Sequence, residues 1–206
     1  MSTADLSKNA LLAEASYSDL EDIIDEEDVE DELKLNGVAS SQAAELVSEW
    51  RVAHHLPNTE SGFSATLFES KDNPGQYTLA IRGTEAGTLE DLISADLWGI
   101  VTRGYARDQI YSLYNYYMQL ITPASETVGQ WVKTGEYGAV EGSAIHLPLY
   151  EFQQDAVSGL GVIVDETGQN TNFDAVVSVS GHSLGGHLAL AFSRLFPEWA
   201  SSVYTF

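Results

Sequence analysis

Apolar and polar positions along the chain follow two spacings. Residues 3–24 and 40–56 carry apolar side chains at roughly helical intervals, which predicts two helices, the second ended by Pro57. Residues 63–70 and 76–83 alternate or run apolar on either side of Lys-Asp-Asn-Pro-Gly. This pattern predicts a β-hairpin with a Pro-Gly turn.

The middle of the chain is less regular. Residues 106–121 predict an amphipathic helix with an apolar face, and its tyrosines are interpreted as core rather than as a ligand cage. Residues 122–152 are rich in Gly, Ser and Thr, which predicts an irregular insertion with a short hairpin as the alternative. Residues 153–164 predict renewed regular structure, with a helix as one form of it. The insertion as a whole is placed near 122–160.

The last third alternates strand and helix. Residues 173–180 predict a buried strand, 184–196 a helix stopped by Pro197, and 201–206 the start of another strand. This order predicts an α/β fold whose mostly parallel central sheet is covered by helices on both faces. The length favours a single domain over residues 1–206.

Composition narrows the possible partners. The chain has 31 acidic and 9 basic residues, a net charge of -22, which opposes binding to nucleic acid or to an anionic membrane. No cysteine is present, so disulfides and thiolate metal sites are excluded. The N-terminus lacks the basic stretch and apolar run of a signal peptide, and no apolar window is long enough to span a membrane.

Residues 19–32 hold ten acidic side chains in fourteen positions. This run resembles an EF-hand loop but lacks its central glycine and alternating ligand spacing. A solvated acidic helix face or loop is the favoured interpretation. Loose binding of calcium, as a structural ion, is the alternative.

The candidate chemistry lies in Gly-His-Ser-Leu-Gly, residues 181–185. A serine between glycines at a strand-to-helix junction is typical of a nucleophile elbow, where Gly181 and Gly185 let strand and helix approach closely. Ser183 then adopts a strained backbone conformation, and the Leu184 N–H becomes an oxyanion donor at the helix N-terminus. The alternative is a glycine-rich turn with an incidental serine.

The five histidines give no obvious base for this serine. His182 is adjacent in sequence, so at a sharp turn its side chain points away from the serine hydroxyl. His187 is interpreted as a packing or surface residue. His54 and His55 are predicted to close the second helix, and His146 is interpreted as a structural histidine in the insertion.

Two segments together resemble a known family. Val-Ser-Val-Ser-Gly-His-Ser-Leu-Gly-Gly, residues 177–186, is similar to the nucleophile segment of the class 3, fungal-type, lipases and of related type-I-secreted bacterial lipases. Residues 79–97 resemble the strand of that family that ends in Arg-Gly-Ser/Thr, followed by a lid segment and Ala-Asp-Leu. The resemblance covers roughly residues 63–97 and 173–206 and implies an α/β-hydrolase fold.

The resemblance implies roles only at matched positions. Ser183 would be the nucleophile, and Thr84 and Leu184 would supply the oxyanion hole. Arg82 and Asp96 would form a buried ion pair behind it, and residues 85–93 would form the lid.

A serine nucleophile needs a histidine base and an acid, which in this family follow the serine in the order Asp, then His. Both are therefore expected beyond residue 206 of a longer enzyme. A completing second chain is one alternative, and a base from His54, His55 or His146 is another.

The function implied is a carboxylester hydrolase, above all a triacylglycerol lipase acting on lipid esters at a lipid–water interface. Phospholipase A1 activity is the nearest alternative, and a non-catalytic module that binds a lipid or a partner is the alternative from another class. No cofactor is required for this chemistry. The type-I-secreted relatives imply secretion without a signal peptide and calcium-binding repeats downstream.

Overall fold

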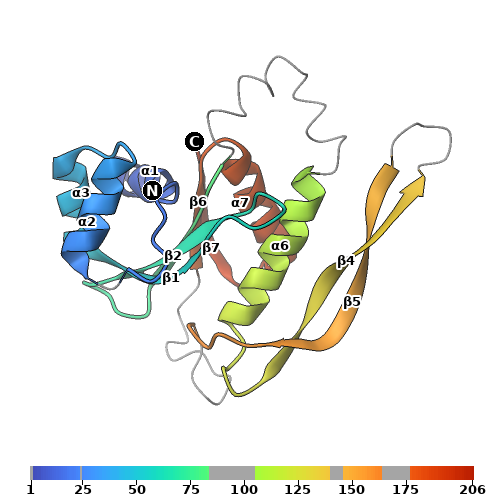
Figure 1. The fold of residues 1–206 in the computed structure, drawn as a ribbon. Coiled ribbons are helices and arrows are strands. Elements are labelled where there is room, and N and C mark those ends of the chain that lie inside the picture. Colours follow the sequence, from blue (N-terminus) through green and yellow to red (C-terminus); the bar gives the residue numbers. More distant parts are fainter. Residues whose placement is uncertain (1, 24, 84–104, 140–145, 164–176) are drawn as a thin grey trace. The chain divides into compact units, whose positions relative to one another are not determined.

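The computed structural model describes residues 2–23, 25–83, 105–139, 146–163 and 177–206 (Figure 1). They belong to two compact units, Met1–Gly83 with Thr171–Phe206 and Thr84–Asn170. The first unit contains α1 (Thr3–Ala15), α2 (Glu26–Leu35), α3 (Ser40–Glu49), β1 (Trp50–Leu56), β2 (Ala65–Ser70), β3 (Tyr77–Ile81), β6 (Val177–Gly181), α7 (Leu184–Leu195) and β7 (Ala200–Thr205). The second contains α6 (Tyr105–Leu120), β4 (Thr127–Ala139) and β5 (His146–Ser158). The expectation of one domain with an insertion near 122–160 stays a prediction.

The fold is α/β, as predicted. The sheet of the first unit is mixed, however, so the prediction of a mostly parallel sheet is wrong. The strand order is β1-β2-β3-β6-β7, with β1, β2 and β3 antiparallel and β3, β6 and β7 parallel. The reason is the length of the connections. The turn between β2 and β3 is too short for the crossover that a parallel pair requires.

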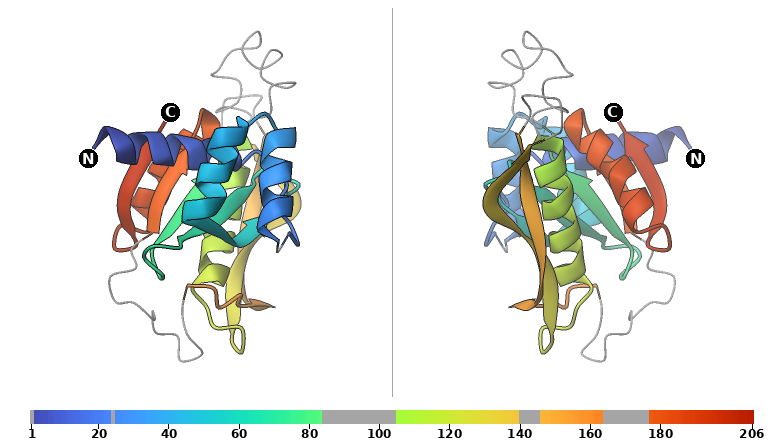
Figure 2. Two further views of the ribbon diagram at one scale, coloured as in Figure 1. Left: turned by 90° about the vertical axis from the view of Figure 1, so that its left-hand side faces the viewer. Right: turned by 90° about the vertical axis from the view of Figure 1, so that its right-hand side faces the viewer.

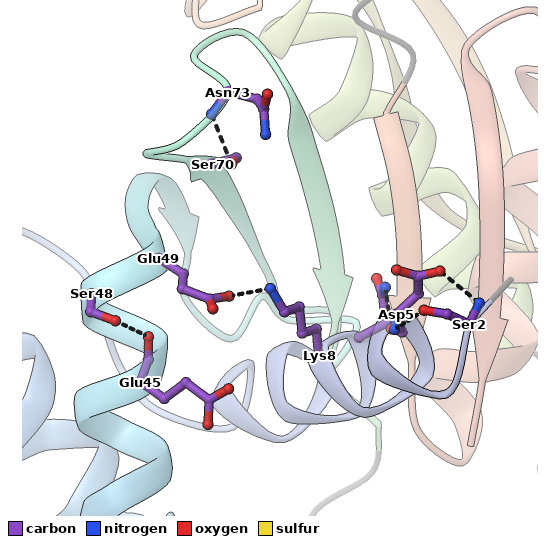
Figure 3. A network of polar contacts seen from close by, with 9 residues as sticks. Ser2, Asp5, Lys8, Glu45, Ser48, Glu49, Ser70 and Asn73 are labelled. Atoms are coloured by element: carbon purple, nitrogen blue, oxygen red, sulfur yellow. Dashed lines mark hydrogen bonds and ion pairs between the residues drawn. The ribbon is translucent and has the colours of Figure 1, made fainter.

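The predicted hairpin is confirmed in β2 and β3. Every residue of both strands is buried, as expected for strands covered on two faces. At the turn the Asn73 N–H donates to the Ser70 hydroxyl at 3.2 Å, and Gly75 takes a φ of 90° that favours glycine (Figure 3). These local bonds explain why the turn could be predicted from its sequence.

Helix α1 begins at a capping box and is shorter than predicted. The Ser2 hydroxyl accepts from the Asp5 N–H, and the Asp5 carboxylate accepts from the Ser2 N–H (Figure 3). The helix ends at Ala15 rather than continuing to residue 24. There the Ser16 hydroxyl donates back to the Ala13 carbonyl at 2.7 Å, one of the local bonds by which serine favours helix ends.

Two helices cover opposite faces of the parallel strands. Figure 2 shows α1 in front of the strands in one view and α7 in front of them in the opposite view. Helix α1 packs on β3, β6 and β7, and α7 packs on the same three strands. The predicted strand–helix–strand order of the last third is therefore confirmed.

The acidic run contributes to α2, in agreement with a solvated helix face. Asp25 caps this helix by accepting from the Glu27 N–H at 2.9 Å, and acidic side chains fill the first turn, where the helix dipole favours them. Val29 and Leu33 are the buried residues of α2. They join the core formed with α1, α3 and β2.

The predicted helix over residues 40–56 is wrong in its second half. Helix α3 ends at Glu49, and β1 follows directly. Strand β1 pairs with β2, and the Arg51 guanidinium donates to the Glu69 carboxylate across this pairing. Cross-strand pairing with a distant segment thus overrides local helix propensity. As a consequence His54 and His55 lie on an edge strand and do not end a helix.

The second unit contains more regular structure than predicted. Helix α6 is confirmed, with Leu113, Tyr116, Tyr117 and Leu120 buried. The irregular insertion is wrong and its alternative, a short hairpin, is closer, because β4 and β5 form a long antiparallel hairpin. This hairpin also takes in residues 153–158, for which a helix was one expectation. The Asn115 side chain on α6 donates to the Trp131 carbonyl and accepts from the Trp131 backbone N–H, both at 2.8 Å, which satisfies both backbone groups of this β4 residue. Among the described residues no helix is long and apolar enough to cross a membrane.

Candidate active site around Ser183

Ser183 lies at the sharp turn between β6 and α7. It is the N-cap residue of α7, with φ 56° and ψ −122°. A serine with positive φ is uncommon and costs on the order of 1–3 kcal/mol, so it persists only where neighbouring groups hold it. Here the Ser183 N–H donates to the Phe206 carbonyl at 2.8 Å, and the Gly186 N–H donates to the Ser183 carbonyl at 3.0 Å. The predicted strain at this serine is therefore present, with its backbone bonded on both sides.

Two glycines allow strand and helix to meet at this turn. A Cβ added to Gly181 would lie 2.2 Å from the Gly185 carbonyl oxygen. A Cβ added to Gly185 would lie 2.2 Å from the Ile81 carbonyl oxygen of β3. Neither distance is tolerable for a carbon atom against backbone oxygen. The prediction that small residues are required on both sides of Ser183 is confirmed.

The Ser183 side chain is exposed and makes no capping hydrogen bond to α7. The hydroxyl thus stands at the N-terminus of a twelve-residue helix without being used to cap it. The Leu184 N–H opens this helix and donates to no backbone carbonyl of the described residues. A free N–H and the positive end of a helix dipole can stabilise a negative charge that develops next to the serine.

The Arg-Gly segment after β3 reaches the same turn. Ile81 pairs with Gly181 in the parallel register. A Cβ on Gly83 would lie 2.4 Å from the His182 carbonyl oxygen and 3.4 Å from Ser183 Cβ. The described part of the first motif, residues 79–83, is therefore adjacent in space to the turn that contains Ser183.

Three sequence-predicted features lie outside the described residues. They are the oxyanion residue Thr84, the lid over residues 85–93 and Asp96, the expected partner of Arg82. Their roles stay predictions. Arg82 itself is half-buried just after β3, and its backbone N–H donates to the Ser64 carbonyl at 3.1 Å.

No histidine of the described residues hydrogen bonds to the Ser183 hydroxyl. His187 is exposed on α7, and His182 is exposed with its Nδ1 3.3 Å from the Tyr17 hydroxyl. His55 is buried, its Nδ1 is 2.8 Å from Thr66 Oγ1, and burial lowers its pKa to about 4. The side chain of His146 is not among those described.

Tyr17 is the residue at this site that sequence reasoning missed. It follows α1 and is half-buried, with its hydroxyl at the His182 ring and 2.5 Å from where a Cβ on Gly83 would stand. The contact joins positions 165 residues apart in the sequence. No local pattern signals it, because Tyr17 sits in an ordinary Ser-Tyr-Ser stretch.

A cleft of the first unit lies elsewhere on the described residues. A cleft of about 550 Å³ runs along edge strand β1 and is lined by Trp50, His54, Glu26 and neighbouring residues, without Ser183 or Gly83. A volume alone does not identify a site. The strained Ser183 backbone and the Leu184 N–H, which donates to no backbone carbonyl of the described residues, both lie at the β6–α7 turn. No group of three or more potential metal ligands occurs among the described residues.

Comparison with known proteins finds a distant structural similarity. No protein-family model and no curated protein matches the chain. The chain is similar to the crystal structure of M37 lipase at 15% sequence identity and a TM-score of 0.38, with 98% of this chain and 59% of that chain covered. This chain thus spans less than two thirds of the length of that lipase. A similarity of this size does not establish a family.

Proposed function

We propose that the protein is a serine carboxylester hydrolase of the α/β-hydrolase class in which Ser183 is the nucleophile. The observation that carries this proposal is the Ser183 backbone at φ 56° and ψ −122°, with an exposed hydroxyl that does not cap its own helix. A strained residue at a tight strand-to-helix turn is stable only where its surroundings are built for it. A structural serine at this position would gain more by capping α7.

In the proposed reaction Ser183 Oγ attacks the ester carbonyl carbon and gives up its proton to a general base. The carbonyl oxygen becomes an oxyanion that accepts from the Leu184 N–H and from the predicted second donor, Thr84. The alcohol leaves with that proton. Water then takes the place of the serine hydroxyl as the nucleophile and gives a proton to the same base, which returns it to Ser183 as the fatty acid leaves. The base and its acid are proposed to be a His and an Asp outside the described residues.

The substrate class proposed is a neutral lipid ester, with triacylglycerol first. The joint resemblance of residues 79–97 and 177–186 to the class 3 lipases supports lipid esters. The net charge of -22 favours an uncharged oil surface over anionic phospholipid, which would repel the protein. We also propose that the protein acts outside the cell, that the chemistry needs no cofactor, and that any bound calcium is structural.

The test combines covalent labelling with turnover. A fluorophosphonate probe and the p-nitrophenyl esters of butyrate and octanoate are applied to the wild type, to Ser183→Ala and to Ser193→Ala. Ser193 is a matched control because it lies on the same helix, where its hydroxyl donates to the Leu190 carbonyl. We expect labelling and hydrolysis in the wild type and in Ser193→Ala and neither in Ser183→Ala. A folded wild type that neither labels nor hydrolyses would favour the non-catalytic binding module.

Substrate choice is tested separately on physiological lipids. Fatty-acid release is followed from a tributyrin emulsion and from vesicles of phosphatidylcholine, with the wild type and Ser183→Ala. Faster release from tributyrin supports the triacylglycerol lipase. Faster release from the vesicles would replace it with phospholipase A1.

A further inference from the structure

The cleft of about 550 Å³ in the first unit follows strand β1 along its whole length, because every residue from Trp50 to Leu56 lines it. Strand β1 is at one end of the strand order, and among the described residues β2 is its only neighbour in the sheet. The opposite wall comes from the segment between α1 and α2 and from the helices α2 and α3. The cleft is thus a groove between a sheet edge and two helices.

The outer edge of β1 presents backbone groups that do not bond to β2. The Lys71 N–H donates to the Glu49 carbonyl at 2.8 Å, which marks a hydrogen-bonded pair at the start of this ladder. Such pairs alternate with non-hydrogen-bonded pairs between antiparallel strands, so Trp50 and Val52 direct their backbone groups away from β2. The Trp50 N–H donates to the Leu46 carbonyl at the end of α3. The Trp50 carbonyl and both backbone groups of Val52 therefore face the groove, where an edge strand can accept a further strand.

The inner part of the groove is apolar. On an added strand, the residue opposite Val52 would point its side chain to the face of the sheet that the Val52 side chain occupies. On that face Trp50 and Val52 pack against the core formed with α1, α2 and α3. Val29, Leu46 and Val47 of α2 and α3 line the same groove. A side chain that enters from an added strand would therefore first meet apolar surface.

The rim of the groove is acidic. Glu21 and Asp22 are exposed in its lining, and within the described ranges no cation forms an ion pair with either carboxylate. The lysine and arginine of the lining are each paired with a carboxylate of the protein: Arg51 with Glu69 and Lys71 with Glu26. The uncompensated charge of the groove is therefore negative.

Lysine and arginine side chains combine an apolar stem with a positive end, which matches this sequence of surfaces. We propose that the groove binds an extended basic segment of a partner protein, which adds to β1 as a further strand and directs a Lys or Arg side chain toward Glu21 and Asp22. A second copy of this chain fits less well, because it brings the same acidic rim and a net charge of -22. The inference is independent of the proposed hydrolase, since Ser183 does not line the groove.

The experiment measures the binding of a synthetic hexapeptide, Thr-Lys-Val-Lys-Val-Thr, labelled with rhodamine and followed by fluorescence anisotropy. The buffer contains about 0.15 M NaCl, which screens charges more than about 8 Å apart. One control peptide carries Glu in place of both Lys. A second control keeps both Lys but has methyl groups on their backbone nitrogens. These methyl groups block the bonds to the Trp50 and Val52 carbonyls without changing the charge.

Two protein variants separate the groove from the general acidity of the chain. The first combines Glu21→Gln with Asp22→Asn and removes the two charges of the rim. The second combines Glu14→Gln with Glu198→Gln and is the matched control. It removes two exposed carboxylates of the same unit that do not line the groove.

We expect the Lys peptide to bind the wild type with a Kd on the order of 100 µM. Binding should weaken at least fivefold with the N-methylated peptide and with the rim variant, and it should stay within twofold in the matched control. The Glu peptide should show no saturable binding.

The proposal is overturned if the Lys peptide does not bind or if its N-methylated form binds equally well, because charge alone would then explain the attraction. It is also overturned if the rim variant and the matched control bind equally. Sedimentation equilibrium of the wild type without peptide tests the other occupant. A dimer that the rim variant strengthens would assign this edge to a second copy of the chain and overturn the proposal.

Discussion

Gly185→Ala is the substitution that most directly tests the contact between β3 and α7. The new Cβ would lie 2.2 Å from the Ile81 carbonyl oxygen and 3.0 Å from the Arg82 carbonyl carbon. All the atoms it meets are backbone, so no flexible side chain can move aside. The end of β3 and the start of α7 must therefore separate by roughly 1 Å to restore normal packing.

The expected cost has two parts. Overpacking at a rigid site lowers the free energy of unfolding by about 1–3 kcal/mol. The same displacement moves the Leu184 N–H away from the oxyanion position, and a misplacement of about 1 Å can cost roughly 100-fold in rate. We expect stability and rate to fall together, because the same clash with the Ile81 carbonyl oxygen causes both losses.

Gly186→Ala is the matched control in the next position of the same helix. Its Cβ would lie 3.2 Å from the Gly181 carbonyl oxygen and 3.3 Å from Thr205 Cβ, so shifts of a few tenths of an ångström suffice. Alanine is also better than glycine in a helix by up to about 1 kcal/mol. The net change in stability should lie near zero, with kcat/KM within about threefold of the wild type.

The assays are urea unfolding followed by circular dichroism and hydrolysis of p-nitrophenyl butyrate by the folded protein. The reasoning is refuted if Gly185→Ala and Gly186→Ala are equally stable and equally active. Equal stability with a loss of activity only at Gly185 would show that the backbone absorbs the clash locally, and the assignment of 1–3 kcal/mol to overpacking would then be wrong.

Three further substitutions test side-chain contacts within the first unit, each by urea unfolding. Glu69→Gln should cost about 1–2 kcal/mol, because the buried carboxylate loses its charged bond to Arg51 while that guanidinium stays largely in solvent. Ser180→Ala should cost about 1 kcal/mol, because the Asn9 carbonyl loses a buried donor. Burial lowers the pKa of His55 to about 4 in the folded protein, against 6.5 in the unfolded chain. As the pH falls from 6.5 to 4 the unfolded chain binds the proton first, so the free energy of unfolding falls by at most about 3 kcal/mol. His55→Asn does not titrate and should lose less stability than the wild type between these two pH values.

The parts of the site that could be predicted from the sequence are those fixed by contacts within a few residues. Gly181, Ser183 and Gly185 form one turn, and the clashes that exclude larger side chains arise between β6, α7 and the adjacent β3. The amino-acid types at these three positions therefore predict the shape of the turn. The same holds for the turn at Asn73 and Gly75, whose bonds are local.

The errors lie where distant pairing decides the structure. Trp50 to Leu56 has a sequence compatible with a helix, yet it forms β1, because β2 offers partners such as Glu69 for Arg51. Residues 146–158 were expected to be partly helical, yet they pair with β4 and their aromatic side chains contact those of β4 and α6. Such a partner is visible only once the chain is folded. Tyr17 was missed for the same reason.

The strain at Ser183 explains why distant segments matter for a turn that is locally encoded. Residues 181–186 make the turn possible, but a backbone at φ 56° is stable only against fixed neighbours. Those neighbours are the Phe206 carbonyl beyond β7, the end of β3 at Gly83 and the hydroxyl of Tyr17. The turn is thus specified locally and stabilised from three other segments. Substitutions in those segments should therefore change the reactivity of Ser183 more than equally large changes elsewhere on the sheet.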